Sequence, residues 1–430
     1  MIATLSPRLR QAVSPYTGIV GSLEECLHGT ADPPLFQATC KLVAGEQVIG
    51  APLGHLFSVG GTGSSRAEAA GAAVGEALER YSATYVPHEK LVVATARELG
   101  DAAVDPSRFG LFSGRQHGEP GFPFRRFTAD TRVAWVEGRR LPNGVRTYLP
   151  AELVYLGRAT VAEARPISYS TSNGLSCDER PEVATAKALL ELLERDAFML
   201  VWTNRLSLPL ISVEAGHPGL ETFERAGLRF AAVDLSTVHH LPCVLGVVRA
   251  PDGVPGALGV GAGAAQTAGR AWWKALAEAF SVRAAAVKLA LLDPDGDKRP
   301  VVSFADHIRR YADHRAAAAA AFLDASAEQV SLGSVRPLEG DGADEWIAAL
   351  CGRVEKAGSR AYAVDVTAPD VAELGVSVMR VVAPGLLALD SVHSARFLGG
   401  ARLYEAAARL ELGPPLAGED DLNPDPHPFP

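Results

Sequence analysis

The chain has 430 residues, a formal net charge of −9 and an apolar content of 47%. This length suits one large domain or two to three ordinary ones, and the composition is typical of a soluble globular protein. The negative charge argues against a nucleic-acid surface and an anionic membrane partner, and no stretch reaches the ~20 apolar residues of a membrane span.

The five cysteines are scattered and show no Cys-x-x-Cys spacing, which argues against a structural zinc site and a disulfide framework. No apolar run precedes Pro15, so the sequence predicts no signal peptide. We therefore expect a cytoplasmic protein with reduced, mostly buried cysteines.

In chain order, the first half predicts a strand at 35–43, a Gly/Ser turn at 60–64 and a helix that ends near Thr84. Ser64 or Ser65 is expected to cap this helix. Residues 98–150 are rich in Pro and Gly, with strands expected near 133–137 and 146–149. A strand at 167–171 should lead into a turn at Asn173 and Gly174, and Pro181 suits the first turn of the next helix.

The second half predicts strands at 229–234, 243–249 and 257–261, and then a long helix at 264–291. Residues 303–324 predict one Ala-rich amphipathic helix, on which His307 and His314 would share a face as solvent or groove residues rather than metal ligands. A helix at 343–356, strands at 361–366 and 376–382 and a helix at 401–408 complete the pattern. The fold class expected is α+β, or α/β-like, with sheets packed by three similar helices.

Two of those helices carry the same motif, Glu-x-x-Glu-Arg. It occurs at Glu76, Glu79 and Arg80 and again at Glu191, Glu194 and Arg195. Positions three apart share a helix face, and like charges on an apolar helix are costly without a nearby cation. One copy is typical of a solvated helix, but two copies in small or apolar helices, each close behind a polar Gly/Ser segment, favour a functional site. The third helix repeats half of the pattern, from Lys274 to Glu278.

Four converging carboxylates suit Mg²⁺, which binds oxygen ligands and usually keeps phosphate and water in its shell. Arginines beside them suit phosphate groups. No Gly-x-x-x-x-Gly-Lys-Ser/Thr loop occurs in the chain. The residues therefore predict a Mg-nucleotide site without a Walker loop.

The order of these motifs resembles the YcaO superfamily, and within it the azoline-forming cyclodehydratases that modify ribosomal peptides. The resemblance extends from about residue 15 to the last residue. It rests on the segments 61–64, 76–82, 171–175, 191–197, 259–261, 275–283, 365–371, 380–386 and 424–430. Three positions depart from the family pattern, namely Thr62, Ala72 and Ser281.

The resemblance implies ATP and Mg²⁺ as cofactors and a YcaO domain over residues 1–411, with a possible sub-boundary near 150. It implies Glu76, Glu79, Glu191 and Glu194 as metal ligands, and Arg195 and Arg283 as catalytic phosphate-binding residues. The nucleotide contacts that it implies are Ser64, Arg80, Ser172, Asn173, Glu278 and Arg283. For Arg80, a structural ion pair is an equal alternative.

The tail, residues 412–430, alternates Pro with other residues at its end, which predicts a stiff, extended chain. A Pro-rich end is ordinarily disordered, but within the family such a tail marks azoline formers and reaches the active site. The resemblance implies that the Pro430 carboxylate moves protons or that the tail orders the site, with His427 a packing residue.

The implied partners are a ribosomal precursor peptide, a leader-binding E1-like (ThiF-like) protein, an FMN-dependent azoline dehydrogenase and a second copy of the chain, with products of the thiazole/oxazole-modified microcin type. Two alternatives stay open. One is a thioamide- or amidine-forming enzyme of the same fold, against which the proline tail argues. The other is a non-catalytic scaffold, against which the clustered carboxylates argue.

Overall fold

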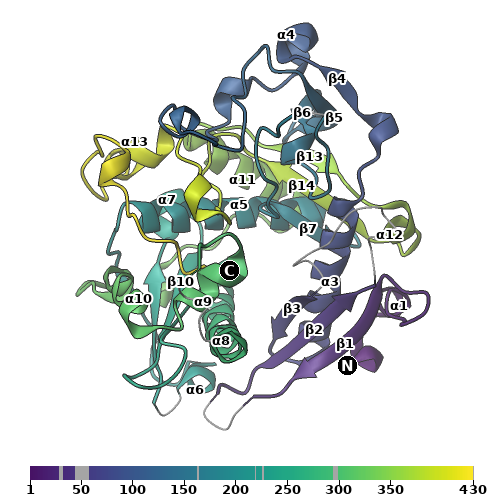
Figure 1. Cartoon of the computed structure of the whole chain (residues 1–430). Coiled ribbons are helices and arrows are strands. Elements are labelled where there is room, and N and C mark those ends of the chain that lie inside the picture. The colour runs from purple at the N-terminus through teal and green to yellow at the C-terminus, as the bar shows by residue number, and fades with distance from the viewer. Residues whose placement is uncertain are drawn as a thin grey trace. The chain divides into compact units, whose positions relative to one another are not determined.

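The computed structural model describes residues 1–28, 32–43, 58–161, 164–217, 219–224, 227–293 and 299–429 (Figure 1). The chain forms two compact units. Unit 1 comprises Met1–Leu27, Phe36–Leu192 and Gly340–Leu386, and unit 2 comprises His28–Leu35, Leu193–Glu339 and Leu387–Pro430. The boundary after Leu192 falls within one long helix, α5 (Pro181–Thr203).

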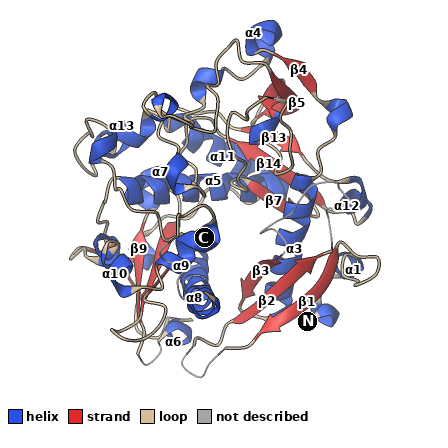
Figure 2. Cartoon of the chain, in the orientation of Figure 1, coloured by secondary structure: helices blue, strands red, loops and turns tan. Residues whose placement is uncertain are grey.

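The described residues of unit 1 form two antiparallel sheets (Figure 2). The first has the order β1-β2-β3, formed by β1 (Val20–Cys26), β2 (Phe36–Leu42) and β3 (Ser58–Gly63). The second has the order β4-β5-β13-β14-β7, with β6 paired to β5. Its strands are β4 (Val92–Ala94), β5 (Val133–Arg140), β6 (Val145–Pro150), β7 (Leu175–Asp178), β13 (Tyr362–Asp365) and β14 (Ser377–Val382).

Helix α3 (Arg66–Thr84) packs against the first sheet of unit 1. Its N-cap is Ser65, whose side chain accepts a hydrogen bond from the Glu68 N–H and so satisfies one of the free donors of the first turn. The face toward the sheet is lined by small residues, among them Ala69, Ala73 and Ala77, which are all fully buried. Small side chains let the helix axis come close to the strands.

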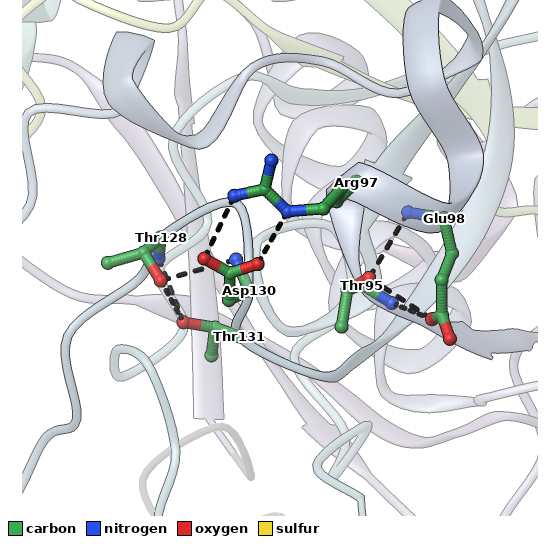
Figure 3. A network of polar contacts seen from close by, with 6 residues as sticks. All are labelled: Thr95, Arg97, Glu98, Thr128, Asp130 and Thr131. Carbon is green, nitrogen blue, oxygen red and sulfur yellow. Dashed lines mark hydrogen bonds and ion pairs between the residues drawn. The ribbon is translucent and has the colours of Figure 1, made fainter.

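The irregular part of unit 1 is held by local polar contacts (Figure 3). Arg97 donates two hydrogen bonds to the Asp130 carboxylate, at 2.7 and 3.0 Å, and so links the two ends of the segment between them. Thr95 and Glu98 form a capping box at the start of α4 (Ala96–Leu99). These groups are exposed, so we assign them a local structural role.

Unit 2 contains a five-stranded sheet of order β11-β10-β9-β8-β12. Its strands are β8 (Leu210–Ser212), β9 (Arg229–Asp234), β10 (Cys243–Arg249), β11 (Leu258–Ala264) and β12 (Gln329–Ser331). The pair β12–β8 is parallel, and the other pairs are antiparallel. Helix α8 (Ala268–Leu292) packs on β11 and β10, and Phe223, Trp272 and Phe280 form the aromatic part of that core.

Among the described residues, the other helices are short, apart from α11. They are α1 (Pro7–Gln11), α6 (Leu220–Phe223), α7 (Ser236–His239), α9 (Phe304–Arg310), α10 (His314–Ala318), α11 (Ala343–Lys356), α12 (Pro369–Glu373) and α13 (Arg402–Arg409). Turns of 3₁₀ helix cover Ile2–Thr4, His88–Lys90, Gly100–Ala102, Pro106–Arg108, Gln116–Gly118, Ala151–Leu153, Ala321–Asp324, Leu332–Ser334, His393–Ala395 and Glu419–Asp421. None of the described helices combines the length and apolar character that crossing a membrane requires.

The α+β class predicted from the sequence is confirmed, as are the long helices α3, α5, α8 and α11. Two predictions are wrong. Residues 167–171 are not a strand, because the strand of this region follows the turn at Gly174 and is β7. Residues 303–324 are not one helix, because α9 ends at Arg310 and the side chain of Asp313 caps a new helix, α10. His307 and His314 therefore lie on different helices, and His307 is fully buried rather than facing solvent.

Candidate active site: two groups of glutamates

The first group of carboxylates lies in unit 1 and includes Glu76 and Glu79 of α3. Helix α3 approaches β3 so closely that a Cβ on Gly61 would stand 2.3 Å from the Ala73 nitrogen. This approach brings Glu76 Oε2 to the Gly60 N–H, at 3.1 Å. Glu79 Oε1 accepts a hydrogen bond of 2.8 Å from the N–H of Cys177 on β7.

Glu191 joins this group through the turn that the sequence predicts at Asn173 and Gly174. The Gly174 N–H donates to Glu191 Oε1 at 3.1 Å. Gly174 has a φ of +78°, and a Cβ there would lie 2.3 Å from the Val381 carbonyl oxygen. Only glycine fits this turn without strain, so the turn that presents its N–H to Glu191 depends on it.

The electrostatics of the first group favour a bound cation. Burial and the neighbouring carboxylates of Glu191 and Glu76 raise the pKa of Glu79 to about 8. Arg80 lowers this pKa, and it forms an ion pair with Glu76 at 3.1 Å. A divalent cation would relieve the remaining repulsion, and carboxylate oxygens are the ligands that Mg²⁺ prefers. The residues present therefore fit a Mg²⁺ ion.

The second group lies in unit 2 and contains Glu194 of α5 and Glu278 of α8. Glu194 is 1% exposed, and its Oε2 accepts hydrogen bonds from the Ala264 N–H at 2.6 Å and from Lys274 Nζ at 3.0 Å. Glu194 Oε1 lies 3.7 Å from Arg195 Nε. Glu278 Oε2 accepts from the Ala262 N–H at 2.7 Å.

The pKa values in the second group move in different directions. Burial raises the pKa of Glu194, but Lys274, Arg195 and the Ala264 N–H outweigh it and hold this pKa below its usual value. Burial raises the pKa of Glu278 to about 7, with Arg195 and Lys274 opposing and Glu194 adding to the shift. Glu194 is therefore ionised and paired, whereas Glu278 titrates near neutral pH.

Asp196, two residues after Glu194 on α5, is held by hydrogen bonds within unit 2. Its carboxylate accepts two hydrogen bonds of 2.6 Å from Arg402, one of 2.8 Å from the Leu387 N–H and a contact of 2.7 Å from His239 Nε2. A fully bonded buried carboxylate resists rotation of the helix. Asp196 thus sets the direction in which Glu194 and Arg195 point.

The two groups are built alike. In each unit three antiparallel strands run in succession into a helix, β1-β2-β3 into α3 and β9-β10-β11 into α8. In each, a helix glutamate bonds the N–H of a residue 16 positions earlier on the last strand: Glu76 with Gly60 and Glu278 with Ala262. Gly261 allows the same close approach as Gly61, since a Cβ there would lie 2.5 Å from the Ala279 nitrogen.

The structure also places the other predicted residues. Ser64 bonds Glu68 through both its N–H and its hydroxyl, so in this structure it stabilises the start of α3. Asn173 is buried and donates to the Thr171 hydroxyl at 2.7 Å, in the same turn as Ser172. Arg283 donates to the Pro255 carbonyl at 2.9 Å and lies 3.9 Å from Asp32. Their nucleotide contacts stay predictions, and Pro430 lies outside the described residues.

The described part of the tail, up to Phe429, is held by polar contacts within unit 2. The Asp425 carbonyl accepts from the Trp202 indole at 3.1 Å, and the Pro426 carbonyl accepts from the Tyr311 hydroxyl. Phe429 is fully buried, and the Arg195 guanidinium lies 4.2 Å from its ring centre. The tail therefore contacts Arg195, the residue beside Glu194, and its described part is fixed by these contacts.

Sequence reasoning missed two cations near the glutamates. Lys274, whose side chain is half-exposed, pairs with Glu194, although the half-repeat from Lys274 to Glu278 was a signal for it. Arg380 is buried in unit 1, where it donates to the carbonyls of Thr171 and Leu153 at 2.8 and 3.1 Å. Burial lowers the pKa of Arg380 to about 10, while Glu191 opposes that shift. Its place in the 380–386 motif was the available signal.

A family model described as YcaO cyclodehydratase, ATP- and Mg²⁺-binding, matches residues 60–387. The chain belongs to the YcaO family. The matched range contains all four glutamates predicted as metal ligands, together with Glu278, Lys274 and Arg380. It ends before the tail.

Solved structures agree with this YcaO fold. A heterocyclase in complex with substrate and cofactor has a TM-score of 0.81 and 23% identity over 100% of this chain and 57% of its own. The heterocyclase TruD has a TM-score of 0.66 and 25% identity over 83% of this chain and 50% of its own. YcaO from Methanopyrus kandleri, bound with AMPPCP and Mg²⁺, has a TM-score of 0.61 and 21% identity over 88% of each chain. This YcaO chain thus spans 57% of the length of the first heterocyclase and 50% of the length of TruD.

Proposed function

We propose that this chain is an ATP-dependent peptide cyclodehydratase, which converts Cys, Ser or Thr residues of a ribosomal precursor peptide to thiazolines or oxazolines. The observation that carries the proposal is the grouping of Glu76, Glu79 and Glu191 in unit 1, where burial and the two neighbouring carboxylates raise the pKa of Glu79 to about 8. Membership of a family described as ATP- and Mg²⁺-binding identifies the cation that would relieve it. The heterocyclase bound to substrate and cofactor supports the reaction class.

The proposed reaction replaces the amide carbonyl oxygen by the C=N bond of a ring, in three steps. The side-chain sulfur or oxygen of the peptide attacks the preceding amide carbonyl and loses its proton. The former carbonyl oxygen then takes the γ-phosphoryl group of ATP, releasing ADP. Departure of phosphate carries that oxygen away, and loss of the amide N–H proton leaves the C=N bond of the azoline. Hydroxide is a poor leaving group, whereas phosphate is a good one, which explains the need for ATP.

Phosphoryl transfer depends mainly on positioning and charge neutralisation. We propose Glu76, Glu79, Glu191 and Glu194 as the carboxylates that hold Mg²⁺, which supplies positive charge next to the phosphates. Arg195 and Arg283 would bind phosphate oxygens, and Ser64, Arg80, Ser172, Asn173 and Glu278 would contact the nucleotide. For Arg80, the 3.1 Å ion pair with Glu76 supports the structural alternative as well.

The tail and the partners complete the proposal. The contact between Phe429 and Arg195 supports a tail that orders the site, with the terminal Pro430 carboxylate as a proton carrier. The proposed partners are the precursor peptide, an E1-like (ThiF-like) protein that binds its leader, an FMN-dependent dehydrogenase that acts afterwards and a second copy of the chain. The proposed product is an antibiotic of the microcin type made in the cytoplasm.

The test is ATP turnover with a candidate precursor peptide and partner protein, read by mass spectrometry of the peptide. Loss of one water mass per ring, abolished by Glu191→Gln, is the expected result. Glu182→Gln is the matched control, because Glu182 lies on the same helix with a partly exposed side chain that pairs with Arg180. If the chain bound no Mg-ATP under any condition, the scaffold alternative would stand instead. A mass change other than water loss would favour thioamide or amidine formation.

A further inference from the structure

A second set of ligating side chains lies within unit 2, and the proposed reaction does not use it. It consists of His307 on α9, Asp390 in the segment after β14, and His427 in the tail. Their exposed fractions are 0%, 2% and 1%, respectively. One ligating atom from each lies within 4.8 Å of the other two. Burying two imidazoles and a carboxylate together is costly unless these groups are paired, because they lose their contacts with water.

Two atoms of this cluster have no hydrogen-bond partner among the described residues. They are His307 Nε2 and Asp390 Oδ1. Leaving a buried polar atom unsatisfied destabilises the fold, and each such atom in a folded protein calls for an explanation such as a bound water or ion. Both atoms belong to the same small cluster, so one occupant would satisfy them together.

The hydrogen bonds of the two histidines leave His307 Nε2 without a partner, while His427 Nδ1 accepts a hydrogen bond of 3.3 Å from the Phe429 N–H. His307 Nδ1 lies 2.7 Å from the His427 carbonyl oxygen, and His427 Nε2 lies 2.8 Å from the Asp390 carbonyl oxygen. A carbonyl only accepts, so these nitrogens carry the protons. The lone pair of His307 Nε2 is free to bind a metal, and a metal on His427 Nδ1 would replace the long hydrogen bond from Phe429. A metal-bound histidine is typically oriented in this way, by an N–H donated to a carbonyl.

The charge state of His307 suits a metal, whereas burial raises the pKa of Asp390 to about 7, so metal binding must displace the proton that part of the Asp390 population carries. Burial lowers the pKa of His307 to about 4, so its ring is neutral at neutral pH, as a ligand must be. The rings of His307 and His427 stack with their centres 4.0 Å apart, an arrangement that neutral imidazoles tolerate. Arg396 and Arg195 lie close enough to influence Asp390 and His427, and their charge opposes a cation, so the ligand bonds must outweigh that repulsion.

The spacing is close to that of a coordination shell. Three atoms no more than 4.8 Å apart share a point within about 2.8 Å of each, which is 4.8 Å divided by the square root of three. Zinc bonds to nitrogen and carboxylate oxygen are ~2.0–2.2 Å long. An inward movement of less than about 1 Å by each side chain would therefore complete the three bonds.

We propose that His307, Asp390 and His427 bind one divalent transition-metal ion of the Zn²⁺ class, with a water as fourth ligand. Two nitrogens and one carboxylate oxygen are a ligand set that such ions favour over Mg²⁺. The ion would join α9, the segment after β14 and the tail, and so hold Phe429 against Arg195. This site is separate from the glutamates and does not depend on the proposed reaction.

The test uses the full chain without a histidine tag, with Mg²⁺ in excess so that the glutamates do not take up the probe. Metal content after purification is measured by mass spectrometry, and Co²⁺ is then titrated into chelator-treated protein. We expect about one Zn²⁺ per chain, visible Co²⁺ absorption typical of a tetrahedral nitrogen and oxygen site, and a higher melting temperature with Zn²⁺. Asp390→Asn and His307→Gln should weaken Co²⁺ binding at least a hundredfold, and His88→Gln, at an exposed position, should not.

A wild-type chain that shows no visible Co²⁺ band and no Zn²⁺-dependent melting shift would overturn the proposal and indicate bound water instead. Equal Co²⁺ affinity in the wild type and both variants would overturn it too, because the metal would then lie elsewhere. A thiolate charge-transfer band would assign the ion to cysteine. These wild-type measurements decide the question even if the variants do not fold.

Discussion

Glu79 in unit 1 and Glu194 in unit 2 are both carboxylates that accept a hydrogen bond from a backbone N–H, yet their pKa values move in opposite directions. The pKa of Glu79 rises to about 8, and that of Glu194 falls below its usual value. Burial raises both, so the difference lies in the neighbours. Glu79 is near two carboxylates and one arginine, whereas Glu194 is near Lys274 and Arg195. Among the charges that shift these two pKa values, Glu79 therefore has one cation, Arg80, whereas Glu194 has two, Lys274 and Arg195.

The largest expected effect is on turnover. Glu79→Gln should lower ATP turnover by about a thousandfold, because it removes a proposed ligand of the ion that neutralises the phosphates. Steady-state ADP release measures it, with Glu182→Gln as the control. Turnover within threefold of wild type would show that the crowded group in unit 1 does not serve the reaction.

The next effect is on the stability of unit 2. Glu194→Gln leaves Lys274 and Arg195 without their carboxylate, and breaking a buried ion pair typically costs ~3–5 kcal/mol. Because half of the Lys274 side chain is exposed and therefore hydrated, we expect a loss of about 2 kcal/mol in urea unfolding. The double variant Glu194→Gln with Lys274→Met should recover part of it. An unchanged midpoint for the single variant would contradict the pairing.

Glu79→Gln should have the opposite effect on stability. The folded pKa of Glu79, about 8, lies above the usual value of 4.5, so the folded state holds a proton that the unfolded state releases between these pH values. The free energy of unfolding of the wild type therefore falls as pH rises from about 5 to 8. In the absence of Mg²⁺, the free energy of unfolding of the variant should exceed that of the wild type by ~1–2 kcal/mol at pH 8 and by little at pH 5. Thermal melts at both pH values measure this, and a variant less stable at pH 8 would refute it.

The smallest effect concerns Arg80. Its ion pair with Glu76 joins two half-buried side chains four residues apart, and such pairs contribute ~0.5 kcal/mol. Arg80→Gln should lower stability by about that amount, and added Mg²⁺ should remove most of the difference. Isothermal titration with Mg-ATP then separates the two roles open to Arg80. A large loss of nucleotide affinity would assign it to phosphate, and an unchanged affinity would leave the ion pair as its role.

The sequence predicted the glutamates because their information is local. The repeat Glu-x-x-Glu-Arg depends only on helix geometry, and α3 and α5 form where it predicts. Lys274 and Arg380 were not predicted as site residues because their partners are distant along the chain. The partner of Lys274 lies 80 positions away and those of Arg380 lie 209 and 227 positions away, so only folding brings them together. The pairing of Glu79 with Cys177 is another contact of this kind.

The failures have a local cause as well. The Ala-rich run at 303–324 supports a helix everywhere, so periodicity could not reveal that Asp313 would accept hydrogen bonds from Arg315 and Ala316 and start a new helix. This break separates His307 from His314 and frees His307 to pack against the tail. The strand expected at 167–171 is absent, and the Thr171 carbonyl instead accepts a hydrogen bond from the Arg380 side chain, which no local pattern indicates.

The close packing of Gly61 on α3 and of Gly261 on α8 has a consequence for how this family can diverge. The depth at which Glu76 and Glu278 reach their strands is fixed by the absence of a methyl group, not by the size of any side chain. These two glycines cannot be replaced step by step, because even alanine, the smallest replacement, would displace a helix. Variation in substrate would then accumulate in loops and surfaces, while the spacing of the carboxylates stays constant.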